Sequence, residues 1–494
     1  MKIIKFLFGT TRGLILVAIT LIALVTAIWG TLSGPMVEWG VRDITVKLLG
    51  MKLNPLERAG RIIMLYHSIA MAVVAIEVYM ITSVVPMRIS HKRTINSTIT
   101  LGYMLAMFGG LGFAYFGHNY ILHGIFLLGQ SLIFYSGIIL AVALWPWREE
   151  YYVSDEVYAH TKKGVDKERI AFFVMTVATL GSAIYGAIAG SMFGNGFNSF
   201  LAEDIIREPY KQVFYRAVIG HLHIMLTLIA VAITLVVSRW VDFKGFWHKL
   251  AMPAFIWGTI IITLGVWSII PFENLAHKII YVGSGLILLG ALFLVIYTWD
   301  MLIREHKKKW GKENAGFFTS IKALLADPLR FGATWQMVFM NFVVTFVGIF
   351  MAINLEEVMR VWMWREERIT LTGHWHVLAG IIATIILLFY GEMINLKGAI
   401  RKIYGWFIII FSDLAFVGAT LYSLKRLFMP EILQEKAVST QMLMIDFGLG
   451  ALLVILAIVL LWRLYDLFRK KGFWTKEMEN PELGLKPTSK ISEQ

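Results

Sequence analysis

The chain has 494 residues, of which 58% are apolar or aromatic, and it has no cysteine. This composition excludes a soluble chain of several domains. The lack of cysteine excludes disulfides, iron–sulfur clusters, thiolate metal sites and covalent haem attachment through a Cys-x-x-Cys-His motif. The formal net charge is +13, but the basic residues lie in loops between apolar runs, which indicates membrane topology and excludes nucleic acid as the partner.

About twelve apolar runs are long enough to cross a bilayer, which requires about 20 helical residues. They cover roughly residues 11–33, 61–86, 97–117, 121–146, 169–193, 211–238, 249–270, 276–300, 333–354, 371–395, 401–424 and 441–464. The first run has too long an apolar core for a cleaved signal peptide. We therefore predict an all-α, polytopic protein with one membrane domain, residues 1–470, followed by a polar tail, residues 471–494.

Alternate loops differ in their content of basic residues. One set contains Arg88, Lys92, Arg93, Lys162, Lys163, Lys167, Arg304, Lys307, Lys308, Lys309, Lys397, Arg401, Lys402, Lys470 and Lys471. The opposite loops carry Arg42, Arg207, Arg365 and Lys425, several of them with Asp or Glu nearby. Because lysine and arginine concentrate in cytoplasmic loops, we predict a multi-pass protein of the plasma membrane with both termini in the cytoplasm.

Three of the predicted spans carry histidine at a similar depth. The second span contains Tyr66-His67-Ser68, the sixth Gly220-His221-Leu222-His223 and the tenth Gly373-His374-Trp375-His376. His221 follows His67 by 154 residues (221 − 67), and His374 follows His221 by 153 (374 − 221). The spans are four apart, so all three cross in one direction with their histidines in the outer third. This repeat predicts three four-helix arcs around an axis normal to the membrane.

Positions two apart on a helix point about 200° away from each other. His374 and His376 therefore leave opposite sides of the tenth span and can serve two separate sites. A single membrane histidine such as His67 is more often a hydrogen-bonding group between helices, or faces a water-filled cavity. Burying a whole set of imidazoles is costly without a strong partner, and the set as a whole favours ligation of haem or a metal.

These features resemble subunit I of the haem–copper oxidase superfamily, which includes the cbb-type oxygen reductases and the nitric oxide reductases. That family has twelve helices in three arcs, with His on helix 2, Gly-His on helix 6 and His-aromatic-His on helix 10. The second span here, from Tyr66 to Pro86, resembles the family's low-spin haem helix. The resemblance covers most of the chain in topology but rests on few residues.

The resemblance implies a role for each membrane histidine. By position, His67 and His376 would be the two axial ligands of a low-spin b-type haem, and His374 would be the proximal ligand of a second haem. His221 corresponds to the helix 6 ligand of the family's copper, whereas His223 has no counterpart. The resemblance therefore implies two b-type haems.

Two basic residues, Lys425 and Arg426, lie at the outer end of the eleventh span. They resemble the pair that holds the haem propionates in this family, and cations suit anions at that position. An ordinary interfacial anchor explains the pair equally well.

The chain departs from the family just after the seventh span, where the reductases carry a His-His pair. Here the sequence reads Val266-Trp267-Ser268-Ile269-Ile270-Pro271-Phe272-Glu273. Isoleucine cannot ligate a metal, so we expect copper to be absent. Glu273 and His277 are candidates for an unusual site with His221, although surface or propionate contacts explain them better. Without the copper, His221 or His223 is placed to take the sixth position of the second haem.

Three carboxylates lie inside predicted spans, namely Glu77, Asp413 and Asp446. Charged groups are costly there and are functional candidates for that reason. Many of the oxidases have a glutamate two residues after the helix 6 histidine, where this chain has His223. Proton pumping is therefore unsupported, and pairing with neighbouring helices explains the acids as well as a proton path does.

The sequence favours a haem b-binding cytochrome that carries electrons from a quinol or other donor to a redox partner in a respiratory chain. Expected partners are the lipid bilayer, a quinol or cytochrome, and other membrane or c-type cytochrome subunits. The alternative is an oxidoreductase, a terminal oxygen or nitric oxide reductase with an altered binuclear centre. A third hypothesis, a transporter of a metal, is disfavoured because none of the three helices has a proline near its histidines.

Overall fold

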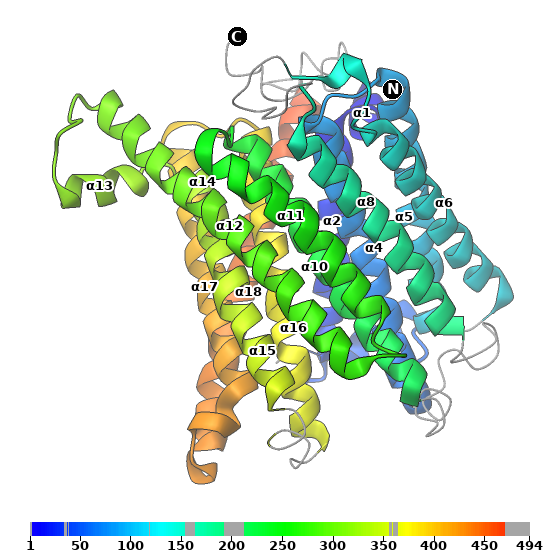
Figure 1. The fold of residues 1–494 in the computed structure, drawn as a ribbon. Coiled ribbons are helices and arrows are strands. Elements are labelled where there is room, and N and C mark those ends of the chain that lie inside the picture. Colours follow the sequence, from blue (N-terminus) through cyan, green and yellow to red (C-terminus); the bar gives the residue numbers. More distant parts are fainter. Residues whose placement is uncertain are drawn as a thin grey trace. The chain divides into compact units, whose positions relative to one another are not determined.

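The computed structural model describes residues 2–33, 37, 39–117, 119–153, 164–191, 212–354, 358 and 364–469. These residues form helices joined by short connections, without β-strands among them (Figure 1). Twelve helices in this part of the chain are long and apolar enough to cross a membrane, which confirms the prediction of an all-α, multi-pass membrane protein. The predicted tail, residues 471–494, lies outside the described residues, as do Lys162, Lys163, Arg207 and Lys470.

The described chain divides into two compact units. Unit 1 comprises Met1–Arg239 and Lys244–Ile287. Its longer helices are α1 (Lys2–Gly9), α2 (Thr11–Ser33), α3 (Val41–Leu49), α4 (Arg58–Val84), α5 (Ile89–Phe116), α6 (Tyr120–Leu144), α8 (Lys167–Ser191), α10 (Gln212–Trp240), α11 (Gly245–Trp267) and the first part of α12 (Glu273–Lys309). Two short 3₁₀ turns, η2 (Pro55–Glu57) and η3 (Glu149–Tyr151), lie between helices.

Unit 2 comprises Trp240–Phe243 and Leu288–Phe473. It holds the rest of α12, then α13 (Phe317–Leu324), α14 (Pro328–Val338), the π-helix η5 (Phe339–Val344), α15 (Thr345–Ile353), α16 (Trp364–Met393), α17 (Gly398–Phe428) and α18 (Glu431–Arg469). The ninth span, Pro328–Met351, is thus built from two α-helical pieces with a π-helical stretch between them. The single membrane domain and the three arcs stay predictions.

Small residues let helices of unit 1 approach at backbone distance. A Cβ atom on Gly129 of α6 would lie 2.3 Å from the backbone nitrogen of Ala106 on α5, and one on Gly109 would lie 2.7 Å from that of Phe126. Lipid tails are as apolar as leucine, so packing of this kind, and not burial from water, holds membrane helices together. The α5–α6 pair is therefore a rigid support within unit 1.

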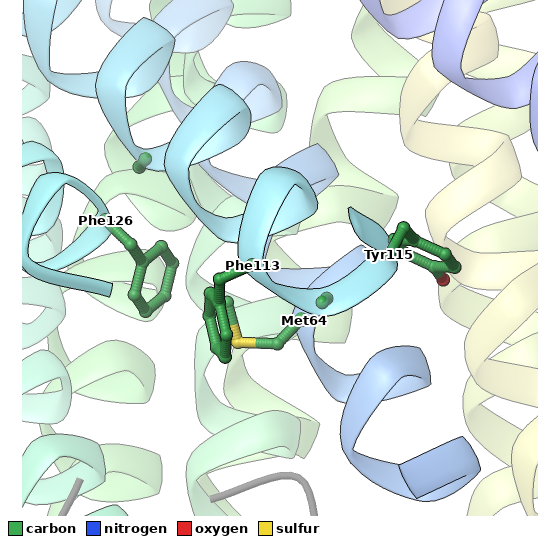
Figure 2. Packing of buried hydrophobic residues seen from close by; sticks show 6 residues of the cluster. Met64, Phe113, Tyr115 and Phe126 are labelled. Carbon is green, nitrogen blue, oxygen red and sulfur yellow. The ribbon is translucent and has the colours of Figure 1, made fainter. Parts of the chain in front are cut away.

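A buried cluster fixes α4 against α5 and α6. Met64 of α4 packs with Phe113 and Tyr115 of α5 and with Phe126 of α6, and none of the four side chains is more than 4% exposed (Figure 2). Interiors of this density resist small displacements. Because Met64 lies three residues before His67, the cluster fixes the part of α4 that carries this histidine.

Buried charges tie the start of α8 to the end of α10 in unit 1. Asp166 precedes α8 and accepts hydrogen bonds from the backbone N–H of Glu168 (2.9 Å) and of Arg169 (3.3 Å). Arg239 of α10 forms ion pairs with Asp166 and with Glu168, the latter at 2.5 Å. Ser238 donates a hydrogen bond to Glu168. Two buried acids therefore share one arginine.

A similar cluster in unit 2 has the opposite ratio of charges, with two arginines around one acid. Asp327 precedes α14 and pairs with Arg330 at 2.7 Å and with Arg401 of α17 at 2.9 Å. Each arginine also reaches a more exposed acid, Arg330 contacting Glu305 at 3.0 Å and Arg401 contacting Glu392 at 2.6 Å. Burial by itself raises the pKa of Asp327, but the two guanidinium groups outweigh it and hold that pKa below its usual value.

Candidate functional site: the membrane histidines

His67 of α4 is oriented by its own helix. Its Nδ1 lies 2.9 Å from the carbonyl oxygen of Ile63, one turn earlier. A carbonyl oxygen only accepts hydrogen bonds, so Nδ1 carries the proton and, in the neutral imidazole, Nε2 keeps its lone pair. Ligating histidines have this arrangement, with one ring nitrogen donating to a carbonyl and the other binding the metal.

His223 of α10 repeats the arrangement. Its Nδ1 lies 2.9 Å from the carbonyl oxygen of Ile219, again one turn earlier, and its side chain is exposed. The residue therefore presents Nε2 away from the backbone of its own helix, as His67 does. The two rings differ from that of His221, whose partner lies on another helix.

His221 is held by α8. Its Nδ1 lies 3.0 Å from the carbonyl oxygen of Ser182. The ring also lies against Gly186, one turn further along α8, where an added Cβ would fall 2.2 Å from both Cε1 and Nδ1. Trp267 of α11 donates from Nε1 to the Oγ of Ser182 at 3.2 Å. Contacts with α8 thus fix this imidazole, Trp267 of α11 bonds to the serine that holds it, and Nε2 keeps its lone pair.

Unit 1 brings two of these histidines near each other. The imidazoles of His67 and His221 are close enough to interact electrostatically. The common depth of the histidines in the second and sixth spans stays a prediction. Unit 1 also contains the three contacts between Nδ1 and a backbone carbonyl that orient His67, His221 and His223.

His374 of α16 belongs to unit 2 and lines a pocket. The pocket is bounded by Val344, Val347, His374, Val377, Thr420, Ser423 and Leu424. Val344 is the last residue of the π-helix η5, and π-helical stretches occur often at functional sites. An added Cβ on Gly348 of α15 would lie 3.6 Å from the His374 ring, an ordinary contact distance. The pocket beside this imidazole has a volume of about 10 Å³, which is room for about one water molecule.

The backbone of α16 is fixed one residue earlier, against α17. An added Cβ on Gly373 would fall 1.8 Å from the Oγ of Ser423, and Thr370 donates a hydrogen bond of 2.8 Å to the carbonyl oxygen of Ser423. His376 follows two residues after His374 and has an exposed side chain, whereas His374 is partly buried. The two rings of α16 thus meet different surroundings, as their spacing predicts.

The predicted ligand sets draw on both units. His67, His221 and His223 lie in unit 1, and His374 and His376 lie in unit 2. The axial pair His67 and His376, and a second haem between His374 and the histidines of α10, stay predictions.

Lys425 and Arg426 lie at the end of α17 in unit 2. Lys425 is buried, with 5% of its surface exposed, and its Nζ lies 4.7 Å from the centre of the Tyr422 ring. Arg426 is partly buried. Whether the pair holds an anion or anchors the helix at the interface stays a prediction.

The stretch after α11 provides no histidine ligand, and its acid is engaged elsewhere. Ile269 is buried with 9% exposure. Glu273, the first residue of α12, forms an ion pair of 2.5 Å with Arg216 of α10. In the part of the chain that the structure describes, no three histidine, aspartate or glutamate side chains gather as a metal-binding group. The unusual site of Glu273, His277 and His221 is therefore not formed in these residues.

The carboxylates within spans have different surroundings. Asp413 of α17 accepts hydrogen bonds from Trp335 Nε1 at 2.8 Å and Gln336 Nε2 at 2.6 Å, both on α14. This is the pairing between neighbouring helices that the sequence leaves open. Glu77 of α4 is 4% exposed, and its Oε1 has no hydrogen-bond partner among the described residues. Asp446 of α18 is partly buried.

Sequence reasoning missed three residues that position His221, namely Ser182, Gly186 and Trp267. A signal for two of them exists, because Ser182, Gly186 and Gly190 repeat at intervals of four on one membrane helix. Small residues at that spacing mark a face where another helix approaches closely. Nothing in the sequence indicates that an imidazole fills the space.

Comparison with known proteins yields no match to a family model, to a curated protein or to a solved structure. The resemblance to the haem–copper oxidase superfamily therefore rests on the residues quoted for it.

Proposed function

We propose that this protein is a haem b-binding cytochrome of the plasma membrane, with both termini in the cytoplasm. It carries electrons between a quinol or other donor and a redox partner in a respiratory chain, together with other membrane or c-type cytochrome subunits. The observation that carries the proposal is the shared orientation of His67, His221 and His223, each with Nδ1 at a backbone carbonyl. In that orientation the proton lies on Nδ1, and Nε2 is the ring nitrogen that would bind a haem iron.

The side chains fit a haem in two further respects. The carbonyl partners fix the tautomer and ring orientation of each histidine and raise its basicity as a ligand, which is how protein groups tune an axial ligand. Lys425 is a buried cation beside Ser423 and Leu424, which line the His374 pocket. A buried cation is stabilised by an anion at hydrogen-bonding distance, and a haem propionate is such an anion.

In this proposal His67 and His376 would hold a low-spin haem, and His374 would hold a second one together with His221 or His223. Bound haem supplies a one-electron iron couple. The protein contributes the imidazoles, the apolar surroundings and the propionate contacts, all of which set the reduction potential. With isoleucine at positions 269 and 270, the chain has no counterpart of the family's histidine pair, and the proposal includes no copper.

Haem content of single-histidine variants tests the proposal. The purified protein is expected to give the pyridine haemochrome spectrum of b-type haem with two haems per chain. His67→Ala and His376→Ala should each lose the same low-spin haem, because the two imidazoles ligate one iron. His306→Ala is the matched control, since His306 bonds to the carbonyl of Leu302 at the end of α12 and should retain both haems. Full haem in both variants, or no haem in the native protein, contradicts the proposal.

Carbon monoxide separates electron transfer from gas reduction. A six-coordinate haem has no open position for a diatomic ligand, so the reduced spectrum should not change when carbon monoxide is added. A shifted spectrum together with a bound second metal would instead support the alternative, a terminal oxygen or nitric oxide reductase. A protein that binds no haem and accumulates metal in vesicles would support transport.

A further inference from the structure

The end of α12 and the helix α13 form an extension of unit 2 that exposes aromatic side chains. Helix α12 has 37 residues, more than a bilayer requires, and ends in His306-Lys307-Lys308-Lys309. In α13, Phe317 is 74% exposed, Phe318 is 85% exposed and Ile321 is 38% exposed. Figure 1 shows α13 projecting to the side of α14 and α17.

Helix α13 has one packed face and one open face. Ala323 is completely buried, and Leu324 packs on the cluster of Leu302, Phe331 and Ile409. At 100° per residue, Phe317, Ile321 and Phe318 lie on an arc of about 100°, and Lys322 follows about 40° beyond it. The open face is therefore apolar with a lysine at its edge, which is the pattern of a helix that lies in a membrane interface.

Specific contacts hold the extension in place. Lys307 donates a hydrogen bond of 2.6 Å to the carbonyl oxygen of Ala315, and this bond closes the turn between α12 and α13. The rings of His306 and Trp310 lie with their centres 6.0 Å apart. Glu305 pairs with Arg330 of α14 at 3.0 Å. The exposed phenylalanines are thus presented by an ordered support.

Exposed lysines lie in the same extension as the apolar face. Lys308, Lys309, Lys312 and Lys322 have exposed side chains, and none of the ion pairs formed among the described residues uses them. Glu313 is the acid within the turn, and Glu305 is already engaged by Arg330. The extension therefore combines exposed positive charge with exposed aromatic surface at the end of a membrane helix.

We propose that this extension is a platform for anionic phospholipid. Phe317, Phe318 and Ile321 insert among the acyl chains, while the four exposed lysines contact the headgroups. A lipid surface is the occupant because α12 is long and apolar enough to cross a membrane, and its charged last residues and α13 follow the part that a bilayer would cover. Clusters of lysine at such an edge attract anionic headgroups, and insertion of aromatic groups adds apolar burial.

Because the chain has no cysteine, a single introduced cysteine can be labelled at a chosen position. Phe318→Cys and Glu313→Cys each give one labelling position, the first on the apolar face and the second in the turn. The full-length protein, labelled with a small fluorophore, is placed in nanodiscs of brominated phosphatidylcholine with and without phosphatidylglycerol. Bromine should quench the label at position 318 several-fold more than the label at 313, and phosphatidylglycerol should increase the difference.

The lysines are tested in the same labelled protein. Lys308→Gln, Lys309→Gln and Lys312→Gln together should raise the mole fraction of phosphatidylglycerol needed for half-maximal quenching about tenfold. The unfolding midpoint of this variant should not change, because the three lysines are exposed. Equal quenching at 313 and 318 overturns the proposal. So does quenching at 318 that vanishes when one labelled copy is diluted among unlabelled copies, which would indicate contact between copies.

Discussion

The two units hold their histidines in different ways. In unit 1 the ring of His221 touches the backbone of α8, with an added Cβ at Gly186 only 2.2 Å from its atoms. In unit 2 the ring of His374 faces a pocket, and an added Cβ at Gly348 would lie 3.6 Å away. The backbone of α8 therefore packs more tightly against the ring of His221 than the backbone of α15 packs against the ring of His374.

The buried charges differ between the units as well. Unit 1 places two acids, Asp166 and Glu168, around Arg239. Unit 2 places two arginines, Arg330 and Arg401, around Asp327, and gives each a second, more exposed acid. Loss of the shared residue therefore has different consequences. In unit 1 it leaves two buried carboxylates together, and in unit 2 it leaves two arginines that each keep a partner.

The largest effect is expected for Arg239→Met. Removing one member of a buried ion pair leaves uncompensated charge and costs about 3–5 kcal/mol, and here two carboxylates lose their partner. The free energy of unfolding, measured by denaturant titration of the purified protein, should fall by that amount. Arg88→Gln is the control, because its ion pair with Glu150 is exposed and such pairs contribute little. Equal losses in the free energy of unfolding for the two substitutions would contradict a stabilising role of the buried cluster around Arg239.

Asp327→Asn should have a smaller effect, about 2–3 kcal/mol, because charge-assisted hydrogen bonds are lost while each arginine keeps one acid. The contribution of Asp327 to the free energy of unfolding also depends on pH, in a definite direction. Since Arg330 and Arg401 hold the pKa of Asp327 below its usual value, its contribution is present above the usual aspartate range. That contribution is lost as the pH falls through the lowered pKa. Unfolding of the native protein should therefore become easier as the pH falls through this range.

The asparagine variant should lose this part of the pH dependence, because its side chain does not titrate. Unfolding midpoints of the two proteins, measured from pH 6 downwards, should therefore converge at the acid end. Curves that stay parallel throughout would show that Asp327 does not carry the effect.

Part of this arrangement is readable in the sequence. Twelve spans follow from apolar runs of bilayer length, and the environments of His374 and His376 differ as the 200° rule predicts. The interaction partners of the buried side chains cannot be read from the sequence. Arg239 lies at the end of α10 and Asp166 just before α8, and the acceptor for His221 is the backbone carbonyl of Ser182, a group that every residue has. Such contacts depend on how helices dock, which periodicity does not encode. The pairing of Glu273 with Arg216 is another of this kind.

Matched glycine substitutions test the contrast between the two histidines directly. Gly186→Ala puts a methyl group into the His221 ring, so the ring or α8 must move, at a cost of about 1–3 kcal/mol for overpacking. Gly190→Ala, one turn later on the same helix, meets nothing within 4 Å and is the control. Gly348→Ala reaches His374 at ordinary contact distance and should change stability by less than about 1 kcal/mol.

A spectroscopic measurement distinguishes a moved ligand from a merely strained helix. If His221 binds iron, Gly186→Ala should alter the electron paramagnetic resonance signal of the haem it ligates, because the ring plane must turn. Gly190→Ala and Gly348→Ala should leave that signal unchanged. A stability loss at Gly348 as large as that at Gly186 would mean that His374 is held as tightly as His221. The proposed difference in packing between the two histidines would then be wrong.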